Sequence, residues 1–356
     1  MKRFIVLFAV ILGIITWGCT KYETENPDLK DSLEKSVADI NNAVNYISTT
    51  KGYQMLNASS AEFKCDDGFR DSIKLDLIAG IYDFKPDLCH YHMFFIPYRL
   101  FQKTGESDNM VINMPHKLAF HPKYLYDINP FDSLLENNFT ISASDYHYYY
   151  SLLSKYDYKL TAGFTLDSED IGSLDVRSAG NKESGISYSS EYMFNEGYKV
   201  SVGFEAGDST VSTFALTQDE EILMKETMIR VRDDLEEKEK KYILTIGNID
   251  IVKGTGIDSM QVYLDGVLQE EAAAVITDTT YYGVSIRHTR NILLTFDDGT
   301  TAKLNELIKP AREALATVVD ALHSMNFATN IVNYIAISIY YHNYLLDDFS
   351  LTGADG

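Results

Sequence analysis

Two stretches, forty residues apart, carry the pattern that decides the fold: residues 158–164 read YKLTAGF and residues 198–204 read YKVSVGF. A looser third copy begins at Tyr242 and reads YILTIG. Apolar and polar residues alternate in all three, which is the pattern of a half-buried β-strand because successive side chains point to opposite faces. We therefore expect repeated β-hairpins in one antiparallel sheet. Chance recurrence of Tyr, Thr and Gly is the alternative to a repeat, and it leaves the strand prediction unchanged.

Alternation continues as far as Phe296, so residues 158–300 are expected to form a β-rich core. Asp265-Gly266 is a dipeptide that favours a tight hairpin turn, because both residues tolerate positive φ. The pattern is mixed over residues 61–157, where five of the seven prolines fall. Prolines at that density exclude long helices but allow short strands, such as one over residues 109–114.

Three segments outside this core have helical periodicity. Apolar residues recur at steps of three and four over residues 28–48, which predicts an amphipathic helix that Lys51-Gly52 ends. Two further helices are predicted over residues 310–324, opened by Pro310, and over residues 327–346. The sequence thus predicts an α+β fold: an antiparallel sheet of repeated hairpins with the N-terminal helix and the two C-terminal helices packed on it. Residues 28–346 are expected to form a single body.

The N-terminus has the organisation of an export signal. Two basic residues precede the apolar run Phe4–Ile15, which has the length of a signal-peptide core and is too short to span a bilayer as a helix. Gly18-Cys19 follows, and a small residue before Cys at this place is typical of a bacterial lipobox. We predict a lipoprotein signal peptide over residues 1–18, lipidation of Cys19, a tether over residues 19–27 and a frayed tail over residues 347–356. A plain signal peptide with a chance Cys is the alternative.

The charge balance limits the classes of partner. Lys and Arg number 31 against 52 Asp and Glu, a net charge of −21. A nucleic-acid partner is not expected, because phosphate binding needs a basic face. An anionic lipid surface would also repel this body, so the predicted contact with the membrane is through the N-terminal acyl chains alone.

The remaining cysteines and two neighbouring histidines form one candidate group. Cys65 and Cys89 are the only pair that an exported chain could oxidise to a disulfide, and two free buried thiols are the alternative. His90 and His92 would share one face of a strand, as weak candidate metal ligands. A closed site needs three or four ligands, and packing among aromatic neighbours is the alternative. No metal or other cofactor is predicted.

Residues 145–150 read DYHYYY, the densest aromatic cluster in a chain with 25 tyrosines. Exposed tyrosines stack on sugars or fill protein interfaces. Tyr146, Tyr148, Tyr149 and Tyr150 are therefore a candidate binding surface. The alternative is that alternate tyrosines face the core and the sheet surface, since aromatic residues are favoured in strands.

Recognisable catalytic motifs are missing from the sequence. We find no H-E-x-x-H, P-loop, G-x-S-x-G or dinucleotide fingerprint. Adjacent acidic pairs such as Asp297-Asp298 are expected at solvated turns, because Asp favours turns. The sequence therefore predicts a protein without catalytic activity.

The lipobox-like motif, the short acidic tether and the tyrosine-rich β body resemble the uncharacterised lipoproteins of Bacteroidota-type cell envelopes. The resemblance implies a protein lipid-anchored in the envelope, in the outer membrane, that faces the periplasm or the cell surface; Glu23 and Glu25 suit the surface. It implies no site residue. The expected role is non-catalytic binding of a protein or glycan, or a structural one. Two alternatives stay open: a carrier of an apolar ligand in a cavity between sheet and helices, and an enzyme with an unrecognised site.

Overall fold

The computed structural model describes ten segments: residues 28–58, 72–85, 100–120, 135–151, 155–181, 184–233, 236–255, 260–281, 287–323 and 327–340. Strands dominate, and a few helices accompany them. The prediction of an α+β protein built on a large antiparallel sheet is confirmed. Cys19, Cys65, Cys89, His90 and His92 lie outside the described residues, as do the predicted signal peptide, tether and tail.

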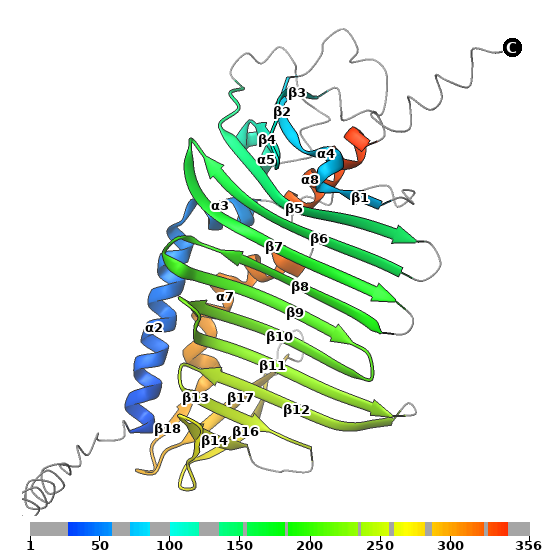
Figure 1. Ribbon diagram of the computed structural model, residues 1–356. Coiled ribbons are helices and arrows are strands. Elements are labelled where there is room, and N and C mark those ends of the chain that lie inside the picture. Colours follow the sequence, from blue (N-terminus) through cyan, green and yellow to red (C-terminus); the bar gives the residue numbers. More distant parts are fainter. Residues whose placement is uncertain are drawn as a thin grey trace, which may run out of the picture.

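The large sheet contains fifteen of the described strands, in the order β15-β14-β13-β12-β11-β10-β9-β8-β7-β6-β5-β4-β2-β3, with β1 paired to β5 (Figure 1). Its strands are β1 (Ser72–Lys74), β2 (Gly80–Phe84), β3 (Phe101–Gly105), β4 (Met110–Met114), β5 (Phe139–Ser151), β6 (Lys155–Leu166), β7 (Glu169–Asn181), β8 (Gly185–Met193), β9 (Tyr198–Ala206), β10 (Ser209–Gln218), β11 (Glu221–Asp233), β12 (Glu236–Ile246), β13 (Ile249–Lys253), β14 (Gln261–Leu264) and β15 (Val267–Leu268). From β4 to β15, each strand pairs with its neighbour in sequence. Asp265 and Gly266, with φ of 50° and 76°, make the predicted tight turn between β14 and β15.

One pair departs from the expected antiparallel pattern. β2 and β4 run parallel, while β3 pairs antiparallel with the other edge of β2. The chain therefore passes to the edge of the sheet as β3 and returns across β2 before it forms β4 (Figure 1). A parallel neighbour needs such a crossover, which alternation in the sequence does not reveal.

The helices differ from the predicted ranges at their ends. The described helices are α2 (Leu29–Thr49), α3 (Lys51–Ala58), α4 (Leu75–Ile78), α5 (His116–Phe120), α7 (Leu304–His323) and α8 (Phe327–Tyr340). Asp28 caps α2 by accepting a hydrogen bond from Lys30 N at 3.3 Å. Lys51-Gly52 does not terminate the helical region; extended Thr50 breaks it, and α3 starts directly afterwards. α7 begins at Leu304 rather than at Pro310, so the proline lies inside the helix.

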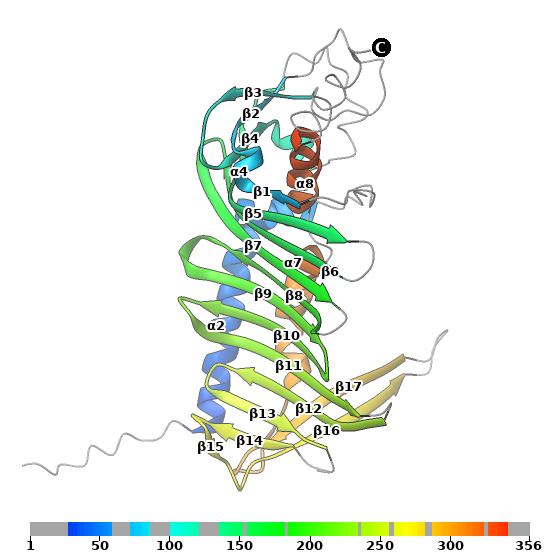
Figure 2. The same cartoon turned by 45° about the vertical axis from the view of Figure 1, so that its right-hand side comes forward.

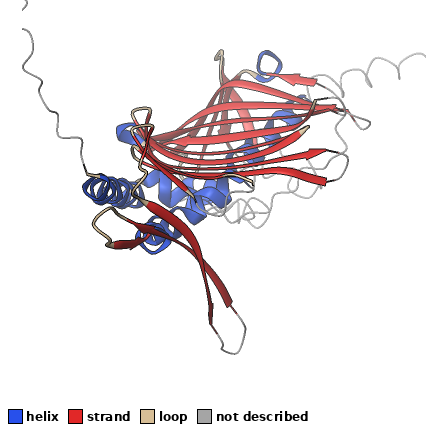
Figure 3. Ribbon diagram, turned by 90° about the horizontal axis from the view of Figure 1, so that it is seen from below, coloured by secondary structure: helices blue, strands red, loops and turns tan. Residues whose placement is uncertain are grey.

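The helices cover one face of the sheet, and the other face is uncovered. Figure 3 shows α2 and α7 together on the same side of the stacked strands. α7 crosses β8 and β9, while α2 runs along the strand ends and contacts β11, β12 and β13. On the covered face Val176, Val200 and Leu216 are fully buried, because they pack beneath the helices. Their neighbours in sequence point to the uncovered face.

A smaller sheet lies beside the large one. It consists of β16 (Ala273–Tyr281), β17 (Arg287–Thr295) and β18 (Thr301–Lys303), and β17 packs on α7. The β16–β17 pair extends away from the large sheet (Figure 2). Among the helices of the described residues, none combines the length and the apolar character needed to cross a membrane.

Candidate functional site

The covered face of the sheet is largely occupied by packing. Tyr146 is 2% exposed, and its hydroxyl donates a hydrogen bond to Asn333 Oδ1 of α8 at 3.0 Å. Tyr188 donates its hydroxyl to the backbone oxygen of Leu322 at the end of α7. Arg312 of α7 pairs with Glu226 of β11. Side chains of this face thus fix the helices in place, which leaves the opposite face free to bind a ligand.

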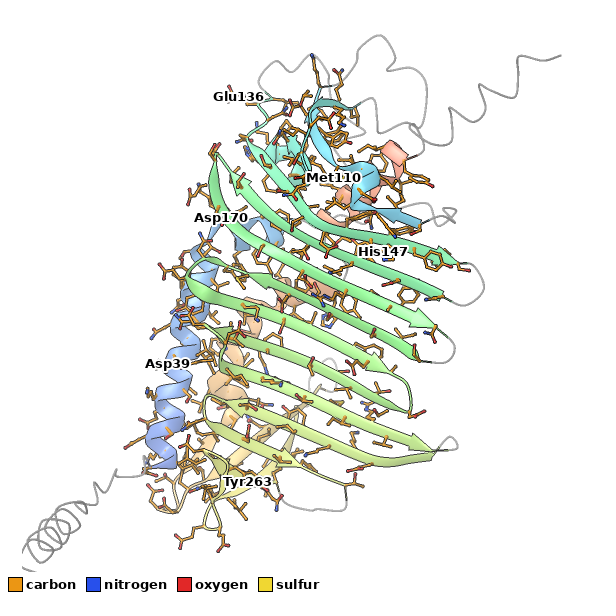
Figure 4. All side chains as sticks on the ribbon, viewed as in Figure 1. Asp39, Met110, Glu136, His147, Asp170 and Tyr263 are labelled. Carbon is orange, nitrogen blue, oxygen red and sulfur yellow. The ribbon has the colours of Figure 1, made fainter. Side chains whose placement is uncertain are left out.

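The uncovered face is polar over the central strands (Figure 4). Register pairing places nine small or polar residues on it: Thr161, Gly163, Asp175, Arg177, Ser189, Glu191, Ser201, Gly203 and Thr213. The figure labels His147 and Tyr263, which lie on the same face toward its two ends. A sheet face with no helix over it must be compatible with water, and hydroxyl and charged side chains meet that requirement.

A hollow of about 420 Å³ opens in this face over β7, β8, β9 and β10. Gly203 is among its lining residues, and the register partners of Gly203 are Ser189 on β8 and Thr213 on β10. A Cβ added at Gly203 would lie 2.5 Å from Thr213 Oγ1, so only glycine leaves this space free. Glycine inside a strand often marks a place where a ligand approaches the backbone closely.

Two carboxylates face each other beside the hollow. Asp175 on β7 and Glu191 on β8 are direct cross-strand partners. Like charges in that relation destabilise a sheet unless other groups compensate. Asp175 accepts hydrogen bonds from Thr161 Oγ1 at 2.7 Å and from Arg177 Nε at 3.1 Å. Lys199 Nζ lies 3.8 Å from Glu191, so each carboxylate has its own neighbouring cation.

Glu205 adds a third carboxylate to the lining of the hollow. Its side chain is exposed, and no ion pair joins it to any residue that the structure describes. The hollow therefore combines acceptors on Asp175, Glu191 and Glu205 with donors on Arg177, Ser189 and Ser201. This arrangement suits a ligand that is rich in hydroxyl or ammonium groups.

The described residues do not provide a metal centre. No group of three or more His, Cys, Asp or Glu side chains within them is placed to hold an ion. His116 Nδ1 lies 3.0 Å from Asn138 Oδ1, which anchors that ring in a loop contact. The chemistry that the hollow offers is hydrogen bonding and charge complementarity.

The predicted tyrosine surface is divided between the two faces of β5. Tyr146 belongs to the core, and Tyr148 is partly buried against the ring of Tyr158, with centroids 6.4 Å apart. Tyr149 points to the uncovered face, where its register partners are Ser72 and Asp157, and Tyr150 points to the covered face. The hollow lies on other strands, so the tyrosine cluster does not contribute to it.

Sequence reasoning did not single out the charged residues of the hollow. Asp175, Arg177, Glu191 and Glu205 come from three different strands, and only the strand register brings them together. The signal that was available is Gly203, in the middle of an alternating run where a strand would otherwise place a side chain.

Comparison with known proteins adds no relative to this description. No protein-family model, curated protein or solved structure matches the chain.

Proposed function

We propose that this protein binds a polar ligand in the hollow of its uncovered sheet face and performs no chemistry on it. The observation that carries the proposal is the hollow of about 420 Å³ around Gly203, lined by three carboxylates, one guanidinium and several hydroxyls. Its volume lies within the range of roughly 300–1,000 Å³ that is typical of small-molecule sites. The ligand class that fits this lining best is a glycan, because its hydroxyls donate to carboxylates and accept from Arg and Ser.

The small side chains beside Gly203 limit the affinity that we expect of the hollow. Gly203 lies between Ser189 of β8 and Thr213 of β10 in the sheet, and both side chains are small and polar. Binding would then rest on hydrogen bonds rather than on stacking, and groups exposed to water exchange one set of hydrogen bonds for another. We expect a weak site whose specificity comes from the positions of its carboxylates.

We further propose that the body is carried on a lipid at Cys19 in the bacterial cell envelope, in the outer membrane. Support comes from the apolar run Phe4–Ile15 and from Gly18-Cys19, which follows it. A Cys19→Ala variant is expected to stay in the soluble fraction and to lack the mass of the acyl chains. A membrane-bound Cys19→Ala protein of unshifted mass would refute the anchoring.

The architecture forms part of the same proposal. The two matching segments place Lys159, Thr161 and Gly163, and likewise Lys199, Ser201 and Gly203, on the uncovered face. We take them as repeated hairpins that supply the ligand-binding face, with the N-terminal and C-terminal helices as its backing. Sites built on strands are held more rigidly than sites on loops, which favours a preorganised surface.

The two glycines supply a matched pair of variants for the test. A Cβ at Gly203 would enter the hollow, whereas a Cβ at Gly163, in the corresponding position of the other segment, meets nothing within 4 Å. We would screen purified protein against a glycan array and measure the best binder by calorimetry. Glu205→Gln is expected to weaken binding about tenfold, as for the loss of one hydrogen bond to a charged group. Gly203→Ala is also expected to weaken it, because the new methyl group would occupy part of the hollow, and Gly163→Ala to leave it unchanged. Equal binding by all three variants would place the ligand elsewhere.

A further inference from the structure

A second group of charges lies on the other face of the sheet, away from the hollow. Arg230 of β11 and Lys240 of β12 are direct cross-strand partners. They belong to the helix side, because Arg230 lies four residues from Glu226, which pairs with Arg312 of α7. Two cations opposed in this way repel each other, which destabilises the pair unless an anion lies between them.

The guanidinium of Arg230 has almost no acceptor. Its Nε is buried without a hydrogen-bond partner. Its Nη2 lies 3.3 Å from the sulfur of Met228, which is a weak acceptor. A buried donor of a charged group is costly to leave unpaired, so this arrangement indicates a missing acceptor.

Among the described residues, the side chains that flank Arg230 and Lys240 on this face add further donors. Thr210 of β10 is the register partner of Arg230 on its other side. Lys253 of β13 pairs with Tyr242, one step along the same face from Lys240. No acidic side chain within the described ranges forms an ion pair with Arg230, Lys240 or Lys253.

Arg312 differs from Arg230 in that it has a carboxylate partner. On the same face, that arginine is neutralised by Glu226, and the hydroxyl of Tyr242 donates toward Glu226 Oε2 at 3.5 Å. The sheet therefore supplies an internal carboxylate to one arginine of this face. Among the described side chains, none supplies a carboxylate to Arg230, which lies four residues from Glu226 on the same face of β11.

We propose that Arg230 and Lys240, with the hydroxyl of Thr210, form a binding site for an oxyanion of the phosphate type. A guanidinium presents two parallel N–H donors to such a group, and the ammonium of Lys240 adds a point charge. The phosphate can belong to a free solute or to a lipid headgroup, since both present the same oxygens. The site is independent of the hollow, which lies on the opposite face.

Lys240 and Lys241 give a matched pair of variants. They are neighbours on β12 and lose the same charge on substitution by Gln, but their side chains point to opposite faces. We would titrate full-length protein with inorganic phosphate by calorimetry, with sodium chloride at the same ionic strength as the reference. Arg230→Gln and Lys240→Gln are expected to weaken phosphate binding about tenfold, as for one charge-assisted hydrogen bond. Lys241→Gln is expected to bind as the parent does.

Thermal stability provides a second measurement of the same site. Without phosphate, Lys240→Gln should melt at or above the parent temperature, because it removes the repulsion across the pair. With phosphate, the parent should gain stability and Lys240→Gln should gain less. Equal gains in the parent, Lys240→Gln and Lys241→Gln, or no gain in any of them, would overturn the proposal.

A vesicle arm then distinguishes the two sources of the phosphate. We would sediment the protein with phosphatidylcholine vesicles, with and without phosphatidylglycerol. If the protein sediments only with vesicles that contain phosphatidylglycerol, if Lys240→Gln abolishes this, and if inorganic phosphate releases the protein, the ligand is a lipid headgroup. Lys240-dependent phosphate binding without sedimentation assigns it to a free solute. A negative result for phosphate binding would not bear on the proposed glycan site, because the glycan test uses variants of the opposite face.

Discussion

Replacement of Tyr192 by Phe tests how the central strands are held at their bulge. Tyr192 of β8 is fully buried; its ring stacks on Phe164 at 6.0 Å and tilts against Phe194 at 4.7 Å. Its hydroxyl donates a hydrogen bond to the backbone oxygen of Ile171 at 3.0 Å. The register between β6 and β7 shifts at this point and skips Ile171, which therefore has no partner on β6.

Because the ring stays, Tyr192→Phe removes only this hydrogen bond and leaves a buried carbonyl oxygen without its donor. We expect the free energy of unfolding to fall by about 1–2 kcal/mol. Tyr192→Ala also removes the ring and should cost about 3–5 kcal/mol, as for other large-to-small core substitutions. Urea denaturation followed by far-UV circular dichroism measures both.

Tyr263→Phe is the matched control. The hydroxyl of Tyr263 donates to Gln261 Oε1 at 3.1 Å on a half-exposed surface, where water can replace it. We expect a change within about 0.5 kcal/mol. If Tyr192→Phe were as stable as Tyr263→Phe, the oxygen of Ile171 would have another donor, and the explanation of the bulge would be refuted.

The same tyrosine predicts a dependence on alkaline pH. Burial, and then the charge of Asp170, raises the pKa of Tyr192 well above its ordinary value of 10.0. The unfolded chain loses that proton near its ordinary pKa and the folded chain keeps it, so the contribution is complete below about pH 10 and is lost as the pH rises further. Tyr192→Phe should lose less stability than the parent between neutral and strongly alkaline pH.

Three further outcomes are expected in urea denaturation. Burial, and then the charge of a neighbouring carboxylate, raises the pKa of Tyr242 to about 12; Tyr242→Phe should therefore lose about 2 kcal/mol less than the parent between about pH 10 and 12. Asn333→Leu removes the hydrogen bond that the buried hydroxyl of Tyr146 donates to Asn333 Oδ1 and should cost about 1–3 kcal/mol, part of which Tyr146→Phe should restore in the double variant. Gly185→Ala should cost more than about 1 kcal/mol, because φ is +79° and the new Cβ would collide with the backbone oxygen of Ala206.

Local patterns allowed the class of fold to be predicted. Alternation fixed the strands because one face of the sheet is buried, so a residue such as Val200 must differ in polarity from Ser201. The stripe from Leu29 to Ile47 identified α2 for the same reason, since these two residues are 6% and 0% exposed. Local patterns did not reveal that β4 pairs parallel with β2, or that α7 starts before Pro310. Tertiary packing decides both.

The candidate site was harder to predict, since it depends on register. Asp175 and Glu191 are sixteen positions apart in the sequence and become neighbours only through the pairing of β7 with β8. Arg230 and Lys240 meet through a bulged β11–β12 pair, in which a shift of one residue would turn one of them to the other face. Composition predicted an acidic surface but not the places where charges of one sign face each other.

The two matching segments show why the register matters for function. Three strand steps separate β6 from β9 in this antiparallel stretch, so the copies run in opposite directions and are related by a local two-fold rotation. That relation sets Thr161 and Ser201 in one row, with Asp175 and Glu191 opposed between them. Opposed carboxylates weaken strand pairing, and the neighbouring cations Arg177 and Lys199 offset that repulsion. Both carboxylates also line the hollow, where we expect the proposed ligand to add hydrogen-bond donors to them.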